Sequence, residues 1–314
     1  MVCSSGKNKA AASNPVSLRQ RILRWCFRLR QLLVASLIAL ACIAWPQVRS
    51  RLPQMVQRPE YLVSSDQITI TPAPHWIPEN LIDDVLKRAE LDQPVSLLDP
   101  ALSERIAAAF FTHPWIQDVH RVWKSFPASV RVEVTYREPI AIVQGVDGYY
   151  PIDRDACLLP GSDFNTADIH RYPVIERISS VPMAGQGQPW GDPSVTGAAQ
   201  LAAVLTAPKE NGKTLWETLD LAAILAPRSL SLPGEFIDPE YAIRTSGGSL
   251  ILWGRPPGTR HPGELTVAKK VRRLVDYHRD HGSLDDAPDP YQIDIREWDT
   301  IHRSRLAGNA SARP

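Results

Sequence analysis

Just beyond the first 60 residues, the apolar positions follow a two-residue period, then a helical period twice, and then a two-residue period again. Alternation over residues 67–71 predicts a half-buried strand. Apolar stripes over 81–89 and 102–110 predict two amphipathic helices. An apolar segment at 119–124 and strict alternation over 130–136 predict two more strands. The predicted order is therefore strand, helix, helix, strand, strand.

Prolines mark the ends of these elements. Pro78 suits the first turn of a helix, where its missing N–H is no loss. Asp99 followed by a proline is a favourable start for the second helix. Pro114 ends that helix because the residue before a proline avoids the α region, and Trp115 is predicted to anchor the chain in the core. A Phe126-Pro127 turn joins the last two strands.

A second, β-rich domain is predicted after residue 139. The apolar runs 140–143 and 148–152 flank a Val-Asp-Gly turn and predict a hairpin. Residues 161–193 are rich in Gly, Pro and Ser, so we expect a loop there, apart from a short apolar segment at 173–175. A helix is expected at 196–205.

Further strands are expected at 220–225, 235–237, 241–245, 250–253 and 291–296. A Ser-Gly-Gly-Ser turn joins the third and fourth of them. Residues 264–281 carry an apolar stripe at helical spacing and predict a helix that ends at Gly282, the expected residue after a helix. The basic cluster of this helix is predicted to lie on its solvated face, and it consists of Lys269, Lys270, Arg272 and Arg273.

The order of elements and several sequence runs resemble the FtsQ (DivIB) family of bacterial cell-division proteins, which has a POTRA domain followed by a β domain. The run from Pro114 to Ala141 is similar to the family pattern "PW(V/I)…V.R.(F/Y)P..L.I.V.ER.P.A", with Arg137-Glu138 in place of Glu-Arg. Lys270-Val271 with Leu274 is similar to the family's "K(L/V)..L" helix. The run from Ile293 to Arg296 is similar to its "iDlR" strand.

The N-terminal segment predicts a membrane anchor. Residues 32–45 are apolar and uncharged, and the first 59 residues contain two Lys, eight Arg and no acidic residue. The positive-inside rule then places the N-terminus in the cytoplasm and the folded part outside. A cleaved signal peptide is the alternative, because a run of this length also fits an h-region.

The expected fold class is α+β, with a single N-terminal transmembrane helix, a POTRA-like β-α-α-β-β domain and a β-rich domain with flanking helices. The expected location is the cell inner (cytoplasmic) membrane, with a single pass and the bulk of the chain periplasmic. The expected segments are a basic cytoplasmic tail 1–28, a transmembrane helix 29–48, a juxtamembrane linker 49–64, a POTRA-like domain 65–138, an FtsQ-like β domain 139–298 and a C-terminal tail 299–314.

The resemblance implies a non-enzymatic membrane scaffold of the cell-division complex, which docks an FtsB/DivIC-like and an FtsL-like coiled-coil partner at exposed strand edges. A final strand at 300–303 is possible, although its turn is unlike the family's. The strand edge near 68–71 is a second candidate surface. The residues implied for partner binding are Ile293, Asp294, Ile295, Arg296, Glu297, Trp298, Thr300 and Ile301.

No catalytic or metal site is expected. His278 and His281, with Asp280 beside them, are spaced at a helix end as solvated or capping histidines, with no further ligand identifiable, and neither a nucleophile elbow nor a His-Glu-x-x-His motif is present. The acidic balance after residue 59 argues against nucleic acid, and we expect no cofactor and no small-molecule substrate. Cys157 is predicted to be a packed side chain. Two alternatives stay open: a POTRA protein of another assembly or secretion pathway, and an envelope enzyme with an unrecognised site in the C-terminal domain.

Overall fold

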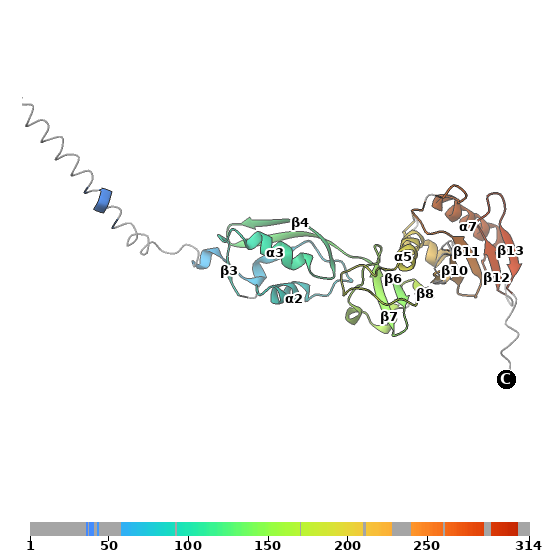
Figure 1. Ribbon diagram of the computed structural model, residues 1–314, viewed down its shortest axis with the longest axis horizontal. Helices are drawn as coiled ribbons and strands as arrows, with labels where there is room; N and C mark the ends of the chain where they lie inside the picture. Colours follow the sequence, from blue (N-terminus) through green and yellow to red (C-terminus); the bar gives the residue numbers. More distant parts are fainter. Residues whose placement is uncertain are drawn as a thin grey trace, which may run out of the picture. The chain divides into compact units, whose positions relative to one another are not determined.

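A computed structural model describes residues 36, 38–40, 43, 58–91, 93–169, 171–209, 212–227, 240–259, 261–285 and 290–306 (Figure 1). The chain divides into two compact units, Met1–Arg58 and Pro59–Pro314. All elements considered below belong to the second unit. We call residues 59–138 the N-terminal lobe and residues 139–306 the C-terminal lobe.

The N-terminal lobe contains a three-stranded sheet in the order β2-β5-β4, with β2 parallel and β4 antiparallel to β5. Two helices, α2 and α3, lie between β2 and β4 in the chain, but the short strands β1 and β3, which pair with each other, were not predicted. The elements are η2 (Pro59–Tyr61), β1 (Leu62–Val63), η3 (Ser65–Gln67), β2 (Ile68–Ile70), α2 (Leu81–Arg88), β3 (Val95–Ser96), α3 (Leu102–Phe111), β4 (Ile116–Ser125) and β5 (Ser129–Tyr136).

One face of this sheet is buried against the two helices. Val130, Val132 and Val134 are buried, whereas Arg131 and Glu133 between them are exposed, as the alternation predicts. Phe110 of α3 and Trp115 fill the space between sheet and helices, and both are almost completely buried. Each such side chain contributes roughly 1.5–3 kcal/mol through the removal of apolar surface from water.

The C-terminal lobe is built on an eight-stranded sheet in the order β13-β12-β11-β10-β9-β8-β6-β7. The helices α5 and α7 pack on the same face, because Leu201 and Leu274 share one core with Ile224 and Ile293. The elements are β6 (Pro139–Gln144), β7 (Tyr149–Asp153), η4 (Gly161–Asp163), α4 (Thr166–Ile169), β8 (Val174–Glu176), α5 (Pro193–Thr206), α6 (Leu215–Thr218), β9 (Leu221–Leu225), β10 (Tyr241–Thr245), β11 (Leu250–Gly254), α7 (Val267–His281), β12 (Tyr291–Asp294) and β13 (His302–Arg305).

The C-terminal lobe corrects the predicted α+β class. The pairs β6–β8, β8–β9 and β11–β12 are parallel, and α5 and α7 lie in the connections of the last two. Parallel neighbours require such crossover connections, so the region is mixed α/β rather than a hairpin-built β domain. The segment 161–193, predicted to be loop, contains β8 as an internal strand. Its only signal in the sequence was the three-residue apolar segment at 173–175.

The predicted transmembrane helix is a second correction to the fold class. Of the residues that the structure describes, no helix is long and apolar enough to cross a membrane. Most of the predicted span 29–48 lies outside the described residues, which include only Ser36, 38–40 and Ile43 of it. The strand predicted at 235–237 also lies outside them.

Polar and aromatic contacts join the two lobes. Trp115 Nε1 donates a hydrogen bond of 2.8 Å to Asp163, and Phe164 stacks on the Trp115 ring at 5.9 Å between centroids. Arg137 forms an ion pair of 2.7 Å with the buried carboxylate of Asp153. The anchor predicted at Trp115 therefore fixes the C-terminal lobe as well as its own core.

Candidate partner-binding site

The sequence-predicted site falls into a buried part and an exposed part. The side chains of Ile293 and Ile295 are completely buried in the core of the C-terminal lobe. They hold β12 in place but offer no side-chain surface to a partner. Glu297, Trp298 and Thr300 are exposed in the connection between β12 and β13, and Ile301 packs against the core.

At this end of the eight-stranded sheet, the terminal strand is β13 rather than β12. It pairs antiparallel with β12, and all four of its residues are exposed. Thr300 and Ile301 precede the strand, so the final strand forms two residues later than 300–303. Leu306 N donates to Pro290 O at 3.0 Å. Because hydrogen-bonding directions alternate along an antiparallel pair, the peptide N–H of position 303 points away from β12.

Arg273 of α7 fixes the β12–β13 connection. Its guanidinium donates to the carbonyl oxygens of Ile295 at 3.4 Å and Thr300 at 3.3 Å, and also to those of Glu297 and Trp298. A planar guanidinium presents five donors in a fixed arrangement, so it can bind several carbonyls of one turn. Arg273 was predicted to lie on a solvated face, because no sequence pattern marks carbonyl acceptors.

Trp298 is the large apolar side chain beside β13. It is 55% exposed, and Lys269 Nζ lies 4.9 Å from its ring centroid. A cation at that distance is attracted to the face of the ring, with a contribution of about 0.5–1 kcal/mol at an exposed site. Trp298 is therefore held in place while most of one side stays accessible, as suits an anchor residue of an interface.

Charged pairs surround the end of β12. Asp294 Oδ2 accepts from Arg296 Nη2 at 2.7 Å, and Arg296 also reaches Glu240 at 2.5 Å. The hydrogen bonds from Arg296 lower the pKa of Asp294 and outweigh the opposing effect of its partial burial. On β13 itself, the Arg303 guanidinium lies 3.5 Å from the centroid of the Tyr291 ring. Asp294 and Arg296, two of the predicted residues, therefore form an ion pair with each other that stabilises the end of β12.

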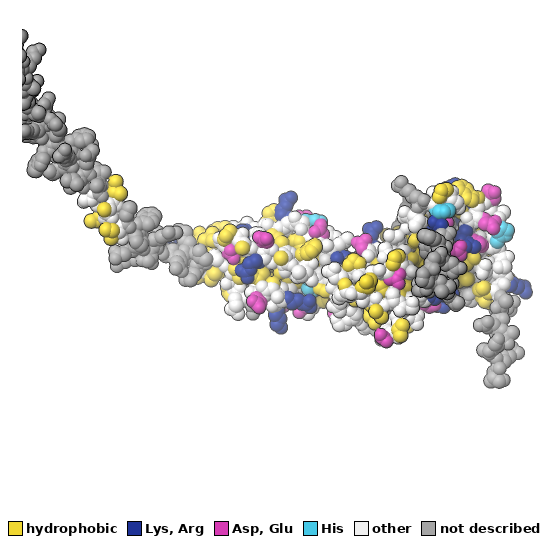
Figure 2. Space-filling view, viewed as in Figure 1, with side chains coloured by type: hydrophobic (Ala, Val, Ile, Leu, Met, Phe, Trp, Pro, Cys, Tyr) yellow, Lys and Arg dark blue, Asp and Glu magenta, His cyan; other side chains and the backbone are white. Residues whose placement is uncertain are grey.

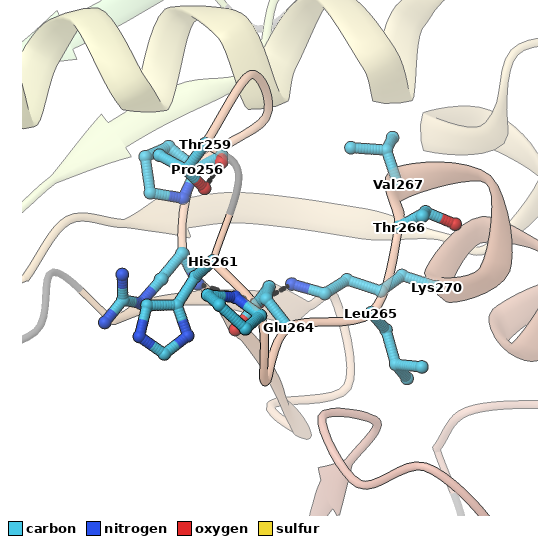
Figure 3. Close-up of a pocket in the computed structure, with 10 residues that line it drawn as sticks. Pro256, Thr259, His261, Glu264, Leu265, Thr266, Val267 and Lys270 are labelled. Carbon is cyan, nitrogen blue, oxygen red and sulfur yellow. Dashed lines mark hydrogen bonds and ion pairs between the residues drawn. The ribbon is translucent and has the colours of Figure 1, made fainter.

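A cavity of about 360 Å³ lies between the β11–α7 connection and the first turn of α7, and Figure 3 shows the side chains that line it. Lys270 points into the wall of this cavity and is 1% exposed, which corrects its predicted place on a solvated face. Its Nζ donates to Trp253 O at 2.6 Å and to the carboxylate of Glu264.

Burial lowers the pKa of Lys270, and the neighbouring Glu264 opposes that shift. Glu264 Oε1 also accepts from the backbone N–H of Arg255 at 3.2 Å. The amine and the carboxylate thus tie the start of α7 to the end of β11. Both groups serve as structural links, so the cavity does not present the amine as a nucleophile.

The histidine cluster at the end of α7 has structural contacts. His281 stacks on Tyr277 at 4.1 Å between centroids, and its Nδ1 lies 2.9 Å from Tyr277 O. Within the described parts of the chain, no group of three or more His, Cys, Asp and Glu side chains could hold a metal ion. Cys157 is 4% exposed and burial raises the pKa of its thiol, so the prediction of a packed side chain is confirmed.

Comparison with known protein families finds no family model that matches this chain, and comparison with curated proteins finds no match either. The resemblance to the FtsQ family therefore stays a prediction from the sequence runs and the order of elements.

Proposed function

We propose that this protein is a non-enzymatic scaffold of the bacterial cell-division complex, similar to FtsQ, which receives an extended segment of a partner on β13. The observation that carries this proposal is the place of β13 at the end of the eight-stranded sheet, with all four residues exposed. A terminal strand offers N–H and C=O groups to an incoming strand, and neighbouring side chains select the partner.

Two features beside β13 support a docking role. The connection before the strand is held by Arg273, so the edge has a fixed shape. Trp298 is exposed next to it and supplies the large aromatic contact that dominates many interfaces. The proposed partners are an FtsB/DivIC-like and an FtsL-like coiled-coil protein, and the proposed location is the outer side of the cytoplasmic membrane.

The proposal assigns no reaction to the cavity beside Lys270. The amine there is engaged by two oxygen acceptors, which favours a structural role over general-base or nucleophilic chemistry. For the alternative of an envelope enzyme, a pocket with a titratable group free to meet a substrate would be needed. For another POTRA-containing assembly pathway, docking on β2 instead of β13 would be the distinguishing result.

The test compares Arg303→Pro with Arg303→Ala. Both variants remove the guanidinium above Tyr291, but only proline also removes the N–H that points away from β12. Binding to the purified FtsB/DivIC-like protein of the same bacterium is measured by titration calorimetry. We expect Arg303→Pro to bind at least about tenfold more weakly than Arg303→Ala, since about one or two hydrogen bonds are lost.

Equal binding of the two variants would exclude β13 as the docking strand. A companion pair, Ile70→Pro and Ile70→Ala on β2, reports on the three-stranded sheet. Thr71 N donates to Val132 O of β5, so the N–H of position 70 points away from β5. If only Ile70→Pro loses binding, the partner docks on the N-terminal lobe. If neither the wild-type protein nor any variant binds the division partner, the proposed scaffold role is wrong.

A further inference from the structure

One end of the N-terminal lobe carries apolar side chains from three separate segments, two of them exposed and Tyr61 half-buried. Tyr61 belongs to η2, Leu98 lies between β3 and α3, and Phe126 lies in the β4–β5 turn; Leu98 is 45% and Phe126 is 66% exposed. The rings of Tyr61 and Phe126 are 5.7 Å apart, and Leu97 N donates to Tyr61 O at 2.7 Å. We call Tyr61, Leu98 and Phe126 the apolar tip.

A cationic side chain of β4 lies beside the apolar tip. Lys124 Nζ donates to Asp99 O at 3.0 Å, which holds the lysine next to Leu98. Arg121 and Trp123 of the same strand pair with Glu133 and Arg131, so they lie on the outer face of the sheet, where Arg121 is 5.1 Å above the Trp123 ring. The nearby carboxylate of Asp99 is paired with Arg105. Figure 2 shows hydrophobic side chains at this end of the unit, where β3 lies in Figure 1.

This combination of side chains is unusual for a face that only meets water. Aromatic residues together with Lys and Arg are enriched where proteins meet the headgroup region of a bilayer. Apolar side chains enter the acyl boundary there, while cations attract anionic headgroups.

The place of the apolar tip in the chain points to the same occupant. η2 is the first element of the second unit, so the chain enters that unit at Tyr61. The preceding 58 residues contain two Lys, eight Arg and no acidic residue, together with the apolar run 32–45. Polybasic segments are attracted to anionic lipid, and this one is covalently joined to the apolar tip.

We propose that the apolar tip is a lipid-contact site, which enters the headgroup region of a bilayer that contains anionic lipid. Phe126 and Leu98 supply the apolar contact, and Lys124 faces the headgroups. A few side chains give only weak binding on their own. The role of the contact is therefore to orient the second unit at the bilayer surface rather than to hold it there. This proposal is independent of docking at β13.

The test uses the full chain and vesicles of phosphatidylethanolamine with and without phosphatidylglycerol. Amide hydrogen exchange is followed by mass spectrometry in peptides that cover 59–62, 97–99 and 123–128. We expect anionic vesicles to slow exchange in all three segments by about tenfold, because burial of one Phe or Leu shifts an equilibrium by that factor or more.

Two variants and a control sharpen the result. Leu98→Ser with Phe126→Ser is expected to lose the slowing, and both positions are exposed enough to leave the core intact. Lys124→Glu is expected to weaken the preference for anionic vesicles. The matched control, Val146→Ser with Met183→Ser, changes two exposed apolar residues of the C-terminal lobe and is expected to behave like the wild type.

Three results would overturn the proposal. The first is unchanged exchange at the three segments while the chain is bound to vesicles. The second is equal slowing in the wild type and in the Leu98–Phe126 variant. The third is slow exchange before vesicles are added that becomes fast in this variant, since the apolar tip would then be covered by another segment of the chain.

Discussion

Each lobe buries one face of a sheet under helices, but the two lobes differ in the side chains that they bury. In the N-terminal lobe, α2 and α3 cover the three-stranded sheet, and the large buried side chains of its core are apolar. In the C-terminal lobe, a larger apolar core is combined with buried polar groups, among them Asp153, Thr245 and Lys270. Among the described residues, every buried Asp or Lys lies in the C-terminal lobe.

The polar groups of the C-terminal lobe hold its connections. Backbone N–H and C=O groups that leave the strand ladder need partners. Lys270 binds the carbonyl of Trp253 in β11, Arg273 binds carbonyls of the β12–β13 connection, and Asp285 binds N–H groups of the β10–β11 turn. We therefore expect the N-terminal lobe to respond mainly to lost volume and the C-terminal lobe to lost polar partners.

The largest expected effect is a cavity in the N-terminal lobe. Phe110→Ala removes a fully buried ring and should lower the free energy of unfolding by about 4 kcal/mol. Urea unfolding followed by circular dichroism measures it. The neighbouring Phe111→Ala is the control, because Phe111 is 62% exposed and should change stability by less than about 1 kcal/mol. Equal costs for both would mean that α3 does not cover the sheet through Phe110.

Removal of a buried cation should come second. Lys270→Met keeps most of the side-chain volume but leaves Glu264 without its amine and Trp253 O without its donor. We expect a loss of about 3 kcal/mol, since one partner of a buried ion pair remains uncompensated. The double variant with Glu264→Leu should recover most of the loss, and Arg272→Met on the exposed face is the control. A cost near zero for Lys270→Met would contradict the contrast between the lobes.

The smallest effect should depend on pH. The Asp285 carboxylate accepts from Thr245 Oγ1 at 2.6 Å, Gly247 N at 3.1 Å and Ser249 N at 3.2 Å. Partial burial raises its pKa, but the hydrogen bonds together outweigh burial and lower the pKa below the usual 3.8. The unfolded chain therefore binds the proton first as the pH falls, so this stabilisation is fully present above pH 3.8 and is lost below it.

Asp285→Asn should therefore cost about 1–2 kcal/mol at neutral pH. The difference from the wild type should shrink as the pH falls below 3.8. Urea midpoints of both proteins across that range measure the effect. A constant difference at all pH values would show that the charge of Asp285 is irrelevant and only its shape matters.

The same contrast explains what the sequence could and could not predict. Alternation over β5 and the stripes of α2 and α3 are visible because each element has one buried face. β8 is short and internal, so it has no alternation to read. Lys270 and Arg273 look like any solvated lysine and arginine in sequence, because their partners are a carboxylate in the preceding loop and backbone carbonyls. The predicted partner-binding residues lie on β12 and in the connection after it, one strand inside the sheet edge that β13 forms.

The charge of β13 has a consequence for self-association. Its sequence, His302-Arg303-Ser304-Arg305, contains no acidic residue. Two copies of this strand that met edge to edge would bring arginines close to one another, and like charges on neighbouring strands repel. An unprotected sheet edge usually invites pairing between identical molecules, and inserted cations are a common safeguard. The arginines of β13 therefore disfavour pairing with a second copy of this strand and favour pairing with a strand that carries carboxylates.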